Sequence, residues 1–303
     1  MGHRAVFTHN DMDGLTCALL TKVAMPDAAV YFCEYSMLAP LLLSKLDRFD
    51  TFWLTDLSLK DDAFFAQVRD SGVEMLWFDH HASSDYQPWM AVCRIDLSGN
   101  LCAAEVVRDY LVEQGIEIPI PLQTLVEWTH DQDLWRRQIP EAADFSDILG
   151  HLSVQELYDD LSADLGRVYQ WTDRMTAASR ATQEARQRSL DLARSTVVEL
   201  PLDADHRVLA CLCWGSVNEV GDALSDARTL VAMLDLRQVE RGQVKFSFRT
   251  KSNSIEAHRI AETLGGGGHA KAAGAPLERA VLQSLTSELA RRVVAAAATV
   301  GEA

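Results

Sequence analysis

The first eighty residues alternate between short apolar runs and longer amphipathic stretches. Apolar runs at residues 5–8, 29–33, 51–54 and 75–78 predict strands. The intervening residues 15–23, 37–46 and 62–69 predict helices, the second of them capped by Ser36. Because this alternation is typical of a parallel sheet with helices on both faces, we predict an α/β fold for this part of the chain.

The rest of the chain indicates a helical connector followed by a second α/β unit. Residues 101–113 and 121–128 fit amphipathic helices, and residues 154–194 are compatible with helix throughout. Beyond Arg207, strands are predicted at 208–212, 229–236 and 244–248, and helices at 217–224, 254–264 and 277–298. We therefore predict two domains, residues 1–190 with the connector and a smaller domain at residues 205–303.

Acidic and histidine residues follow the predicted strands of the first half. The segments are His9 to Asp13, Asp56, and Asp79-His80-His81; a fourth segment, His130 to Asp133, follows the apolar residues 125–128. In an open parallel sheet, ligands bind at the carboxyl ends of the strands, so we expect these side chains to converge.

Converging carboxylates repel one another unless a cation holds them together. A ligand set of Asp and His without Cys suits Mn²⁺ or a similar divalent ion better than a structural zinc. The carboxylates are numerous enough for two ions, which a bridging carboxylate would hold about 3.5–4 Å apart. The sequence thus predicts a site for two divalent metal ions.

The charge of the chain limits its partners. The formal net charge is −16, which disfavours long nucleic acids because their affinity comes mainly from Lys and Arg on phosphates. A short nucleotide in a pocket remains compatible with this charge. Residues 241–271 differ from the rest, since six basic residues against two acidic ones give this segment a charge of +4.

The basic segment also contains four consecutive glycines at 265–268, which would let backbone N–H groups approach an anion closely. Arg249, His269 and Lys271 would add positive charge there. Gly265 would also serve as the C-cap of the preceding helix. We interpret the segment as an anion site.

Cysteine spacing and hydropathy indicate the compartment. The six cysteines include no C-x-x-C pair and lie mostly among apolar neighbours, which is typical of buried, reduced thiols. No apolar run approaches the roughly 18 residues of a membrane span, and no signal peptide is recognisable. We predict a cytoplasmic protein without a membrane partner; the sequence leaves the oligomeric state open, with a homodimer as one alternative.

The motifs together resemble a known superfamily. His9-x-Asp11-x-Asp13-Gly14, Asp56 and Asp79-His80-His81 resemble the first three motifs of the DHH phosphoesterases. The ten residues 265–274, GGGGHAKAAG, resemble the signature of the DHHA1 domain, and the preceding strand would supply Arg249. The resemblance spans residues 9–274, and its two signatures occur in the expected order.

This resemblance implies a role for each matching residue. His9 and Asp11 would bind the first metal, Asp13 and His80 the second, and Asp56 would bridge both. His81 would face the scissile phosphate, supported by Asp79. The fourth motif offers Asp131 or Asp133; we prefer Asp131, because His-Asp-x-x-x-Trp resembles the short oligonucleotidase branch. The substrate-binding residues would be Arg249, Gly266, Gly267, Gly268 and His269.

The resemblance also implies an activity. The expected reaction is two-metal hydrolysis, with Mn²⁺, of short oligoribonucleotides or linear dinucleotides to mononucleotides, in a cleft between the domains. Alternative substrates are 3′,5′-bisphosphorylated adenosine and cyclic nucleotides or dinucleotides. A catalytically inactive nucleotide-binding regulator is a further alternative, but it would lack metal ligands, and the first three motifs are intact.

Overall fold

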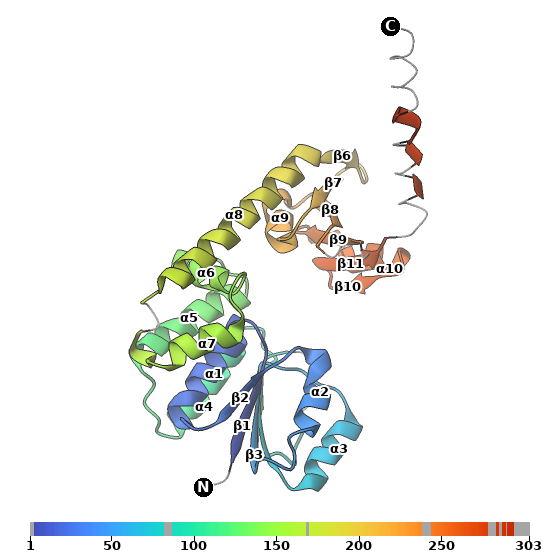
Figure 1. The fold of residues 1–303 in the computed structure, drawn as a ribbon. Coiled ribbons are helices and arrows are strands. Elements are labelled where there is room, and N and C mark those ends of the chain that lie inside the picture. Colours follow the sequence, from blue (N-terminus) through green and yellow to red (C-terminus); the bar gives the residue numbers. More distant parts are fainter. Residues whose placement is uncertain are drawn as a thin grey trace, which may run out of the picture. The chain divides into compact units, whose positions relative to one another are not determined.

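The computed structural model divides into two compact units, residues 1–182 and 183–303. It describes residues 3–81, 87–167, 170–237, 244–277, 283–284, 287–288 and 290–293. The division falls within the long helix α8 (Asp173–Thr196). Each unit is built on a sheet of its own, as Figure 1 shows.

The sheet of the first unit is entirely parallel, as predicted. Its strands lie in the order β2-β1-β3-β4-β5. They are β1 (Arg4–Thr8), β2 (Ala29–Phe32), β3 (Thr51–Thr55), β4 (Glu74–Asp79) and β5 (Val92–Ile95). Strand β5 was not predicted, because this short, half-buried edge strand contains Arg94 and lacks a continuous apolar run.

Alternating side chains send the two faces of this sheet into separate cores. Trp53, Leu76 and Phe78 pack on one face with α1 (Met12–Ala24), α4 (Ala103–Glu113), α5 (Ile120–Asp133) and α7 (Val154–Ser162). Phe52 and Leu54 point the other way, toward α2 (Tyr35–Leu43) and α3 (Asp62–Ser71). Figure 1 shows these helices on opposite sides of the strands. Successive side chains of a strand point to opposite faces, and both faces are buried here. The strands therefore appear in the sequence as continuous apolar runs.

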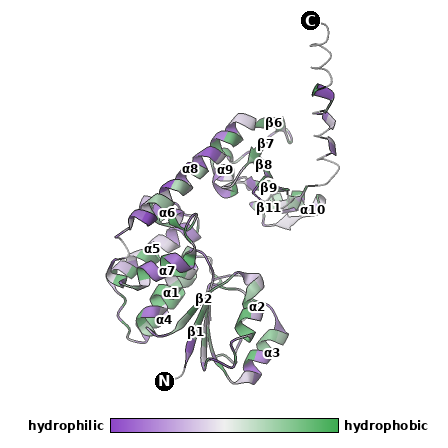
Figure 2. Cartoon of the chain, in the orientation of Figure 1, coloured by the Kyte–Doolittle hydropathy of each residue, from purple (hydrophilic) through white to green (hydrophobic). Residues whose placement is uncertain are grey.

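The connector is interrupted rather than continuous. After α6 (Pro140–Ile148) and α7, the short helix η1 (Leu165–Arg167) precedes α8. The interruption arises because the Asp164 side chain accepts a hydrogen bond from Gly166 N at 3.0 Å, a local turn that competes with helix. The prediction of helix throughout residues 154–194 was therefore wrong at this point. Figure 2 shows many hydrophilic residues, in purple, along α8.

The second unit is a mixed sheet with helices on both faces. Its strand order is β10-β11-β9-β8-β7-β6, and only β7 and β8 pair in parallel among the described strands. The strands are β6 (Val198–Pro201), β7 (Arg207–Cys213), β8 (Thr229–Asp235), β9 (Lys245–Thr250), β10 (Gly267–Gly268) and β11 (Ala272–Pro276). The end of α8 and α9 (Val217–Leu224) cover one face, and α10 (Ala257–Thr263) covers the other.

Three further sequence-based expectations concern the whole chain. The six cysteines are all free thiols. Among the described residues, no helix is long and apolar enough to cross a bilayer. The predicted helix at 277–298 falls mostly outside the described residues.

Candidate metal centre

The topology of the first sheet has a switch point between β1 and β3. The chain leaves β1 toward β2 on one side and later returns to β3 on the other, so the connections diverge there. Such a switch point is where open α/β sheets bind ligands, beyond the carboxyl ends of the strands. His9 directly follows β1, and Asp56 directly follows β3.

The first motif is held by the start of α1. Asp11 caps the helix by accepting a hydrogen bond from Gly14 N at 3.0 Å, and the Thr8 hydroxyl donates to Gly14 O at 3.0 Å. Position 14 requires glycine, because a Cβ there would lie 2.0 Å from the His9 carbonyl oxygen. This close approach brings His9, Asp11 and the first turn of α1 together.

Asp13 is held by a second helix. Its two carboxylate oxygens accept hydrogen bonds from Ala103 N and Ala104 N, both at 2.7 Å, in the first turn of α4. Burial raises the pKa of Asp13 well above its ordinary range, and the negative charges of Asp133 and Asp11 add to this effect. The carboxylate is thus rigidly placed in a strongly negative surrounding.

Asp56 faces two groups at once. Its backbone adopts a left-handed conformation with φ of 53°, and its N–H donates to Phe78 O at 3.0 Å. One carboxylate oxygen, Oδ2, lies 3.8 Å from His9 Nδ1, and the other, Oδ1, lies 3.5 Å from His80 Nε2. Burial, followed by repulsion from Asp13 and Asp11, raises the pKa of Asp56 well above its ordinary range.

The potential metal ligands form three overlapping groups, each with its ligand atoms within 4.8 Å of one another. These are His9, Asp11 and Asp56; Asp13, His80 and Asp133; and Asp56, Asp79, His80 and His81. Asp56 belongs to two of them and His80 to two. The sequence-predicted ligands of the first three motifs therefore converge, as the strand ends suggested.

Two buried atoms of this cluster indicate that it fits cations. Asp56 Oδ2 and His80 Nε2 are buried and have no hydrogen-bond partner within the described part of the chain. His80 Nε2 lies 3.5–3.7 Å from carboxylate oxygens of Asp13, Asp56 and Asp133. Buried polar atoms are normally paired, and clustered carboxylates raise each other's pKa. Divalent ions with oxygen and imidazole ligands would satisfy both conditions.

The remaining histidine of the third motif is oriented by its neighbour. His81 Nδ1 lies 2.8 Å from Asp79 Oδ1, and the same oxygen accepts a hydrogen bond from His80 N at 2.8 Å. Burial lowers the pKa of His81, but the hydrogen bond and charge of Asp79 outweigh burial, so the pKa is raised overall. The charged imidazolium form of His81 is thereby favoured.

In the fourth motif, the residue that lies near the other potential ligands is Asp133 and not Asp131, which we preferred from the sequence. Asp133 joins Asp13 and His80 in the cluster, whereas Asp131 does not. The buried Asp131 carboxylate instead accepts hydrogen bonds from Gln138 N at 2.8 Å and Ile139 N at 3.2 Å. The geometry therefore favours Asp133, the alternative that the sequence left open. The physical reason is that Asp131 stabilises the loop after α5, which leaves Asp133 to face His80.

This assignment can be tested with matched substitutions. We expect Asp133→Asn to weaken Mn²⁺ binding by at least about tenfold, a loss comparable to that of a group supporting a metal site, while the protein stays folded. We expect Asp131→Asn to leave Mn²⁺ affinity near that of the wild type but to destabilise the protein by about 1–2 kcal/mol, because a backbone N–H loses its acceptor. Calorimetric Mn²⁺ titration and urea unfolding of both variants measure the two effects. The reverse pattern would restore Asp131 as the ligand.

Two neighbouring residues of the site were missed from the sequence. Glu34 Oε2 lies 3.8 Å from His9 Nε2, and the Tyr35 hydroxyl lies 3.1 Å from His81 Nε2. We predicted a helix from residue 37 with Ser36 as its cap, but α2 begins at Tyr35 after the N-cap Glu34. Both residues follow β2 closely, so their place beyond a strand end was the signal that could have found them.

In the second unit, Arg249 is anchored rather than free. Its Nε and Nη2 atoms donate to Asn218 Oδ1 at 3.1 and 2.6 Å, and Nη1 donates to Phe248 O at 2.8 Å. Burial lowers the pKa of Arg249, and the positive charge of Arg237 contributes to this. Arg237 itself pairs with Asp235 at 2.7 Å. Asn218 thus holds the Arg249 guanidinium group, and the charge of Arg237 acts on it; neither residue was among the predicted substrate-binding residues.

The glycine run has a packing function. Gly267 and Gly268 form β10, which pairs with Gly274 and Ala273 of β11. A Cβ at Gly266, just before β10, would lie 2.1 Å from Gly274 O, so this segment could not approach β11 as closely with any other residue there. His269 is exposed beyond this pair, while the Lys271 ammonium group donates to Ser252 O and to Asn253 Oδ1. Binding of substrate by residues 266–269 stays a prediction.

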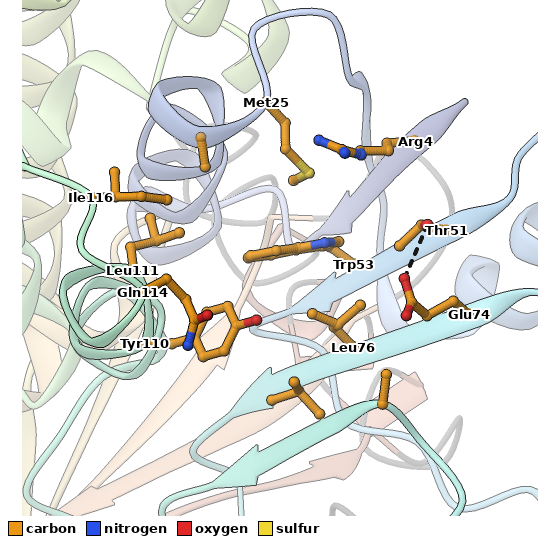
Figure 3. Close-up of a pocket in the computed structure, with 13 residues that line it drawn as sticks. Arg4, Met25, Thr51, Trp53, Glu74, Leu76, Tyr110, Leu111, Gln114 and Ile116 are labelled. Carbon is orange, nitrogen blue, oxygen red and sulfur yellow. Dashed lines mark hydrogen bonds between the residues drawn. The ribbon is translucent and has the colours of Figure 1, made fainter. Parts of the chain in front are cut away.

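A separate hollow lies at the opposite, amino edge of the first sheet. It encloses about 480 Å³ and is lined by the side chains that begin β1, β3 and β4, namely Arg4, Thr51 and Glu74, together with Trp53 and Tyr110 (Figure 3). The predicted metal ligands are not among its lining residues. The metal cluster and this hollow therefore occupy opposite ends of the same strands.

Comparisons with known proteins agree with these features. The family model of the DHHA1 domain matches residues 214–295. Oligoribonuclease NrnB of Bacillus subtilis (strain 168) is 23% identical over 305 residues, covering 94% of this chain and 76% of the relative.

Solved structures show the same fold. The pGpG-specific phosphodiesterase PggH from Vibrio cholerae matches with a TM-score of 0.61 at 13% identity, covering 97% of this chain and 99% of that one. RecJ from Thermus thermophilus in complex with Mn²⁺ matches with a TM-score of 0.53 at 17% identity, covering 94% of this chain and 51% of that one.

The site and these matches define the class of protein first: a metal-dependent phosphoesterase. Within that class, residues 214–295 match the DHHA1 domain, and the chain is similar over most of its length to proteins of the DHH/DHHA1 type. The resemblance seen in the sequence and the predicted fold class are thus confirmed.

Proposed function

We propose that this protein hydrolyses phosphodiester bonds in short oligoribonucleotides or linear dinucleotides, releasing mononucleotides, with two Mn²⁺ ions. The observation that carries the proposal is the geometry of Asp56, whose two carboxylate oxygens face His9 on one side and His80 on the other. A carboxylate placed in this way can bridge two ions, which is the arrangement of two-metal phosphoesterases.

The ligand groups suggest how the ions would be held. His9, Asp11 and Asp56 would bind one ion, and Asp13, His80 and Asp133 would bind the other together with Asp56. When bound, such ions activate water as a nucleophile and neutralise charge on phosphate oxygens. The raised pKa values of Asp13, Asp56 and Asp133 support this, because a cation would remove the repulsion that raises them.

His81 would act on the substrate directly. Asp79 orients the His81 ring through Nδ1, and the raised pKa of His81 favours the charged form, which can donate a hydrogen bond. Such a donor would stabilise negative charge that develops on the phosphate in the transition state. We assign His81 as the catalytic residue and Asp79 as its orienting partner.

We further propose that the domain at residues 205–303 binds the rest of the substrate through Arg249 and residues 266–269. The guanidinium group of Arg249 is oriented by Asn218 and carries positive charge in an otherwise acidic protein. Short substrates are favoured by the net charge of −16, which disfavours long polymers. The names of two similar proteins, an oligoribonuclease and a pGpG-specific phosphodiesterase, agree with this size class.

A substrate panel tests this function. The metal-stripped protein is supplied with Mn²⁺ and incubated with 5′-labelled RNAs of graded length, starting at the dinucleotide, and with bisphosphorylated adenosine, cyclic nucleotides, cyclic dinucleotides and pyrophosphate. We expect rapid release of mononucleotides from the shortest RNAs, no release without Mn²⁺, and slow or no cleavage of the longest RNAs. Chelation should abolish turnover, because the proposed nucleophile depends on the ions.

Each result of the panel has a separate meaning. Cleavage confined to the dinucleotide would narrow the substrate to linear dinucleotides. Faster turnover of bisphosphorylated adenosine or of a cyclic nucleotide or dinucleotide would replace the proposed substrate but keep the chemistry. No turnover of any substrate by protein that binds Mn²⁺ would contradict the proposed function and favour a nucleotide-binding regulator.

A further inference from the structure

Tyr35 contacts the metal cluster although it belongs to none of the motifs. It is the first residue of α2, and its hydroxyl oxygen lies 3.1 Å from Nε2 of His81. The two residues are 46 positions apart in the sequence and meet because α2 and the end of β4 converge at the carboxyl edge of the sheet. This contact is specific, since it joins two polar atoms at hydrogen-bond distance.

The Tyr35 hydroxyl completes a chain of three side chains. On its other side, His81 Nδ1 lies 2.8 Å from Oδ1 of the fully buried Asp79. Both ring nitrogens of His81 are therefore held, one by the end of β4 and the other by the start of α2. Rotation of the ring about its Cβ–Cγ bond would break both hydrogen bonds, so the contact with Tyr35 adds to the cost of leaving this orientation.

The Tyr35 ring is itself held in place by the first motif. Its centroid lies 4.7 Å from that of His9, and it meets His81 edge-on with centroids 5.7 Å apart. Tyr35 thus packs between two histidines that the other observations place near different ligand groups. This packing fixes the direction of the hydroxyl, so that its contact with His81 is determined by the site.

The Tyr35 hydroxyl suits this contact chemically. Burial, followed by the nearby charges of Asp56 and Asp11, raises the pKa of Tyr35, so the phenol keeps its proton. A protonated phenol can accept a hydrogen bond from the imidazolium form of His81 or donate one to the neutral form. The contact therefore persists in either state of the histidine.

We propose that Tyr35 is a positioning residue that holds the His81 ring in the orientation needed to face the phosphate, with the Nε2–H of His81 shared between the Tyr35 hydroxyl and a phosphate oxygen once substrate is bound. This inference rests on the proposed function, in which His81 acts on the substrate. Tyr35 touches His81 and not the reacting atoms, so its effect passes through the histidine. Loss of its hydroxyl should lower kcat by about tenfold, while KM changes little, because orientation of a catalytic group matters mainly in the transition state.

The test compares two tyrosines of the same unit. Tyr35→Phe removes the hydroxyl that contacts His81. The matched control is Tyr31→Phe on β2, because the Tyr31 ring packs against Phe7 while its hydroxyl makes no hydrogen bond within the described part of the chain. Both changes remove one phenolic oxygen from a tyrosine near the same sheet, where Tyr35 is exposed and Tyr31 is half-buried.

The first readout does not depend on activity. In the metal-free full chain, histidine ring nitrogens are observed by long-range ¹H–¹⁵N NMR, and His81 is assigned with the His81→Asn variant. We expect Tyr35→Phe to shift the Nε2 signal of His81 and Tyr31→Phe to leave it unchanged. An unchanged signal in Tyr35→Phe would overturn the proposal, because the hydroxyl would then make no contact with His81.

The second readout is a double-mutant cycle in turnover with the best substrate of the panel. Tyr35→Phe should slow the wild type about tenfold and have almost no effect in a His81→Asn background, because the two residues act as one unit. Equal losses in both backgrounds would overturn the positioning role. If the wild type cleaves no substrate, the proposed function fails, while the NMR shift still decides whether Tyr35 holds His81.

Discussion

Replacing Asp56 by asparagine is expected to lower Mn²⁺-dependent turnover by more than about a hundredfold. Loss of a group that only supports a metal ligand usually costs about 10–100-fold, and Asp56 is proposed to bind the ions directly. At the same time, the metal-free protein should become more stable. Asp56 is buried among carboxylates and its Oδ2 has no hydrogen-bond partner in the described structure. The left-handed backbone at this position, with φ of 53°, is one that asparagine adopts readily.

The stabilisation by Asp56→Asn should depend on pH in a definite direction. The pKa of Asp56 is raised above the ordinary carboxyl value of 3.8, so the folded protein retains a proton that the unfolded chain releases. The stabilisation that this bound proton gives to the wild type is fully present below pH 3.8 and is lost as the pH rises through the pKa of Asp56 in the folded protein. We expect the variant to match the metal-free wild type near pH 4 and to exceed it increasingly toward neutral pH.

Urea unfolding in chelator at several pH values measures this difference, and a turnover assay with Mn²⁺ measures the loss of activity. Asp70→Asn on the exposed side of α3 is the matched control and should change neither property. A variant that is less stable than the wild type at neutral pH, or that keeps full activity, would contradict the role assigned to Asp56.

Replacing Asp13 by alanine is expected to have the opposite effect on stability. Asp13 accepts hydrogen bonds from Ala103 N and Ala104 N, and its removal leaves two buried donors of α4 without partners. Each unpaired buried donor costs about 1–3 kcal/mol, partly offset by relief of carboxylate repulsion, so we expect a net loss of about 2 kcal/mol or more. The metal-free variant should show this loss, because it does not depend on bound ions.

The stability of Asp13→Ala is measured by urea unfolding in chelator, beside the exposed control Asp109→Ala on α4. A large loss for Asp13→Ala and a small one for the control would show that the carboxylate stabilises the start of α4, apart from its proposed role as a metal ligand. Equal stability of the Asp13 variant and the wild type would show that the two N–H groups find other partners. The contrast with Asp56 separates a carboxylate that is structurally required from one that is not.

The sequence predicted the first sheet well, because its central strands are buried on both faces and therefore appear as apolar runs. Strand β5 escaped notice because it is a short edge strand with Arg94 in its middle. In the second unit, β11 consists largely of Ala and Gly, whose strand preference is low, and its pairing with β9 arises from tertiary packing.

The metal cluster was predictable for a topological reason. His9, Asp56 and Asp79 lie at the ends of the first, third and fourth apolar runs, and parallel strands bring their carboxyl ends to one edge. The fourth motif was not predictable in the same way. Asp131 and Asp133 lie two positions apart near the end of a helix, and only the loop after α5, which donates to Asp131, distinguishes them.

Tyr35 and Asn218 show a further limit of sequence reasoning. Each acts through a partner far along the chain, Tyr35 through His81 and Asn218 through Arg249. Aromatic and amide side chains are common in ordinary cores and loops, so their type alone did not mark them. Their roles depend on pair distances that only a three-dimensional structure supplies.

The most direct test of the two-metal centre is a crystal structure of the protein grown with Mn²⁺, with anomalous scattering used to locate the ions. We predict two Mn²⁺ ions about 3.5–4 Å apart, with Asp56 bound to both through its two oxygens. We also predict Asp133, and not Asp131, on the ion shared with Asp13 and His80. A single ion, or two ions that Asp56 does not bridge, would contradict the two-metal centre proposed for this protein.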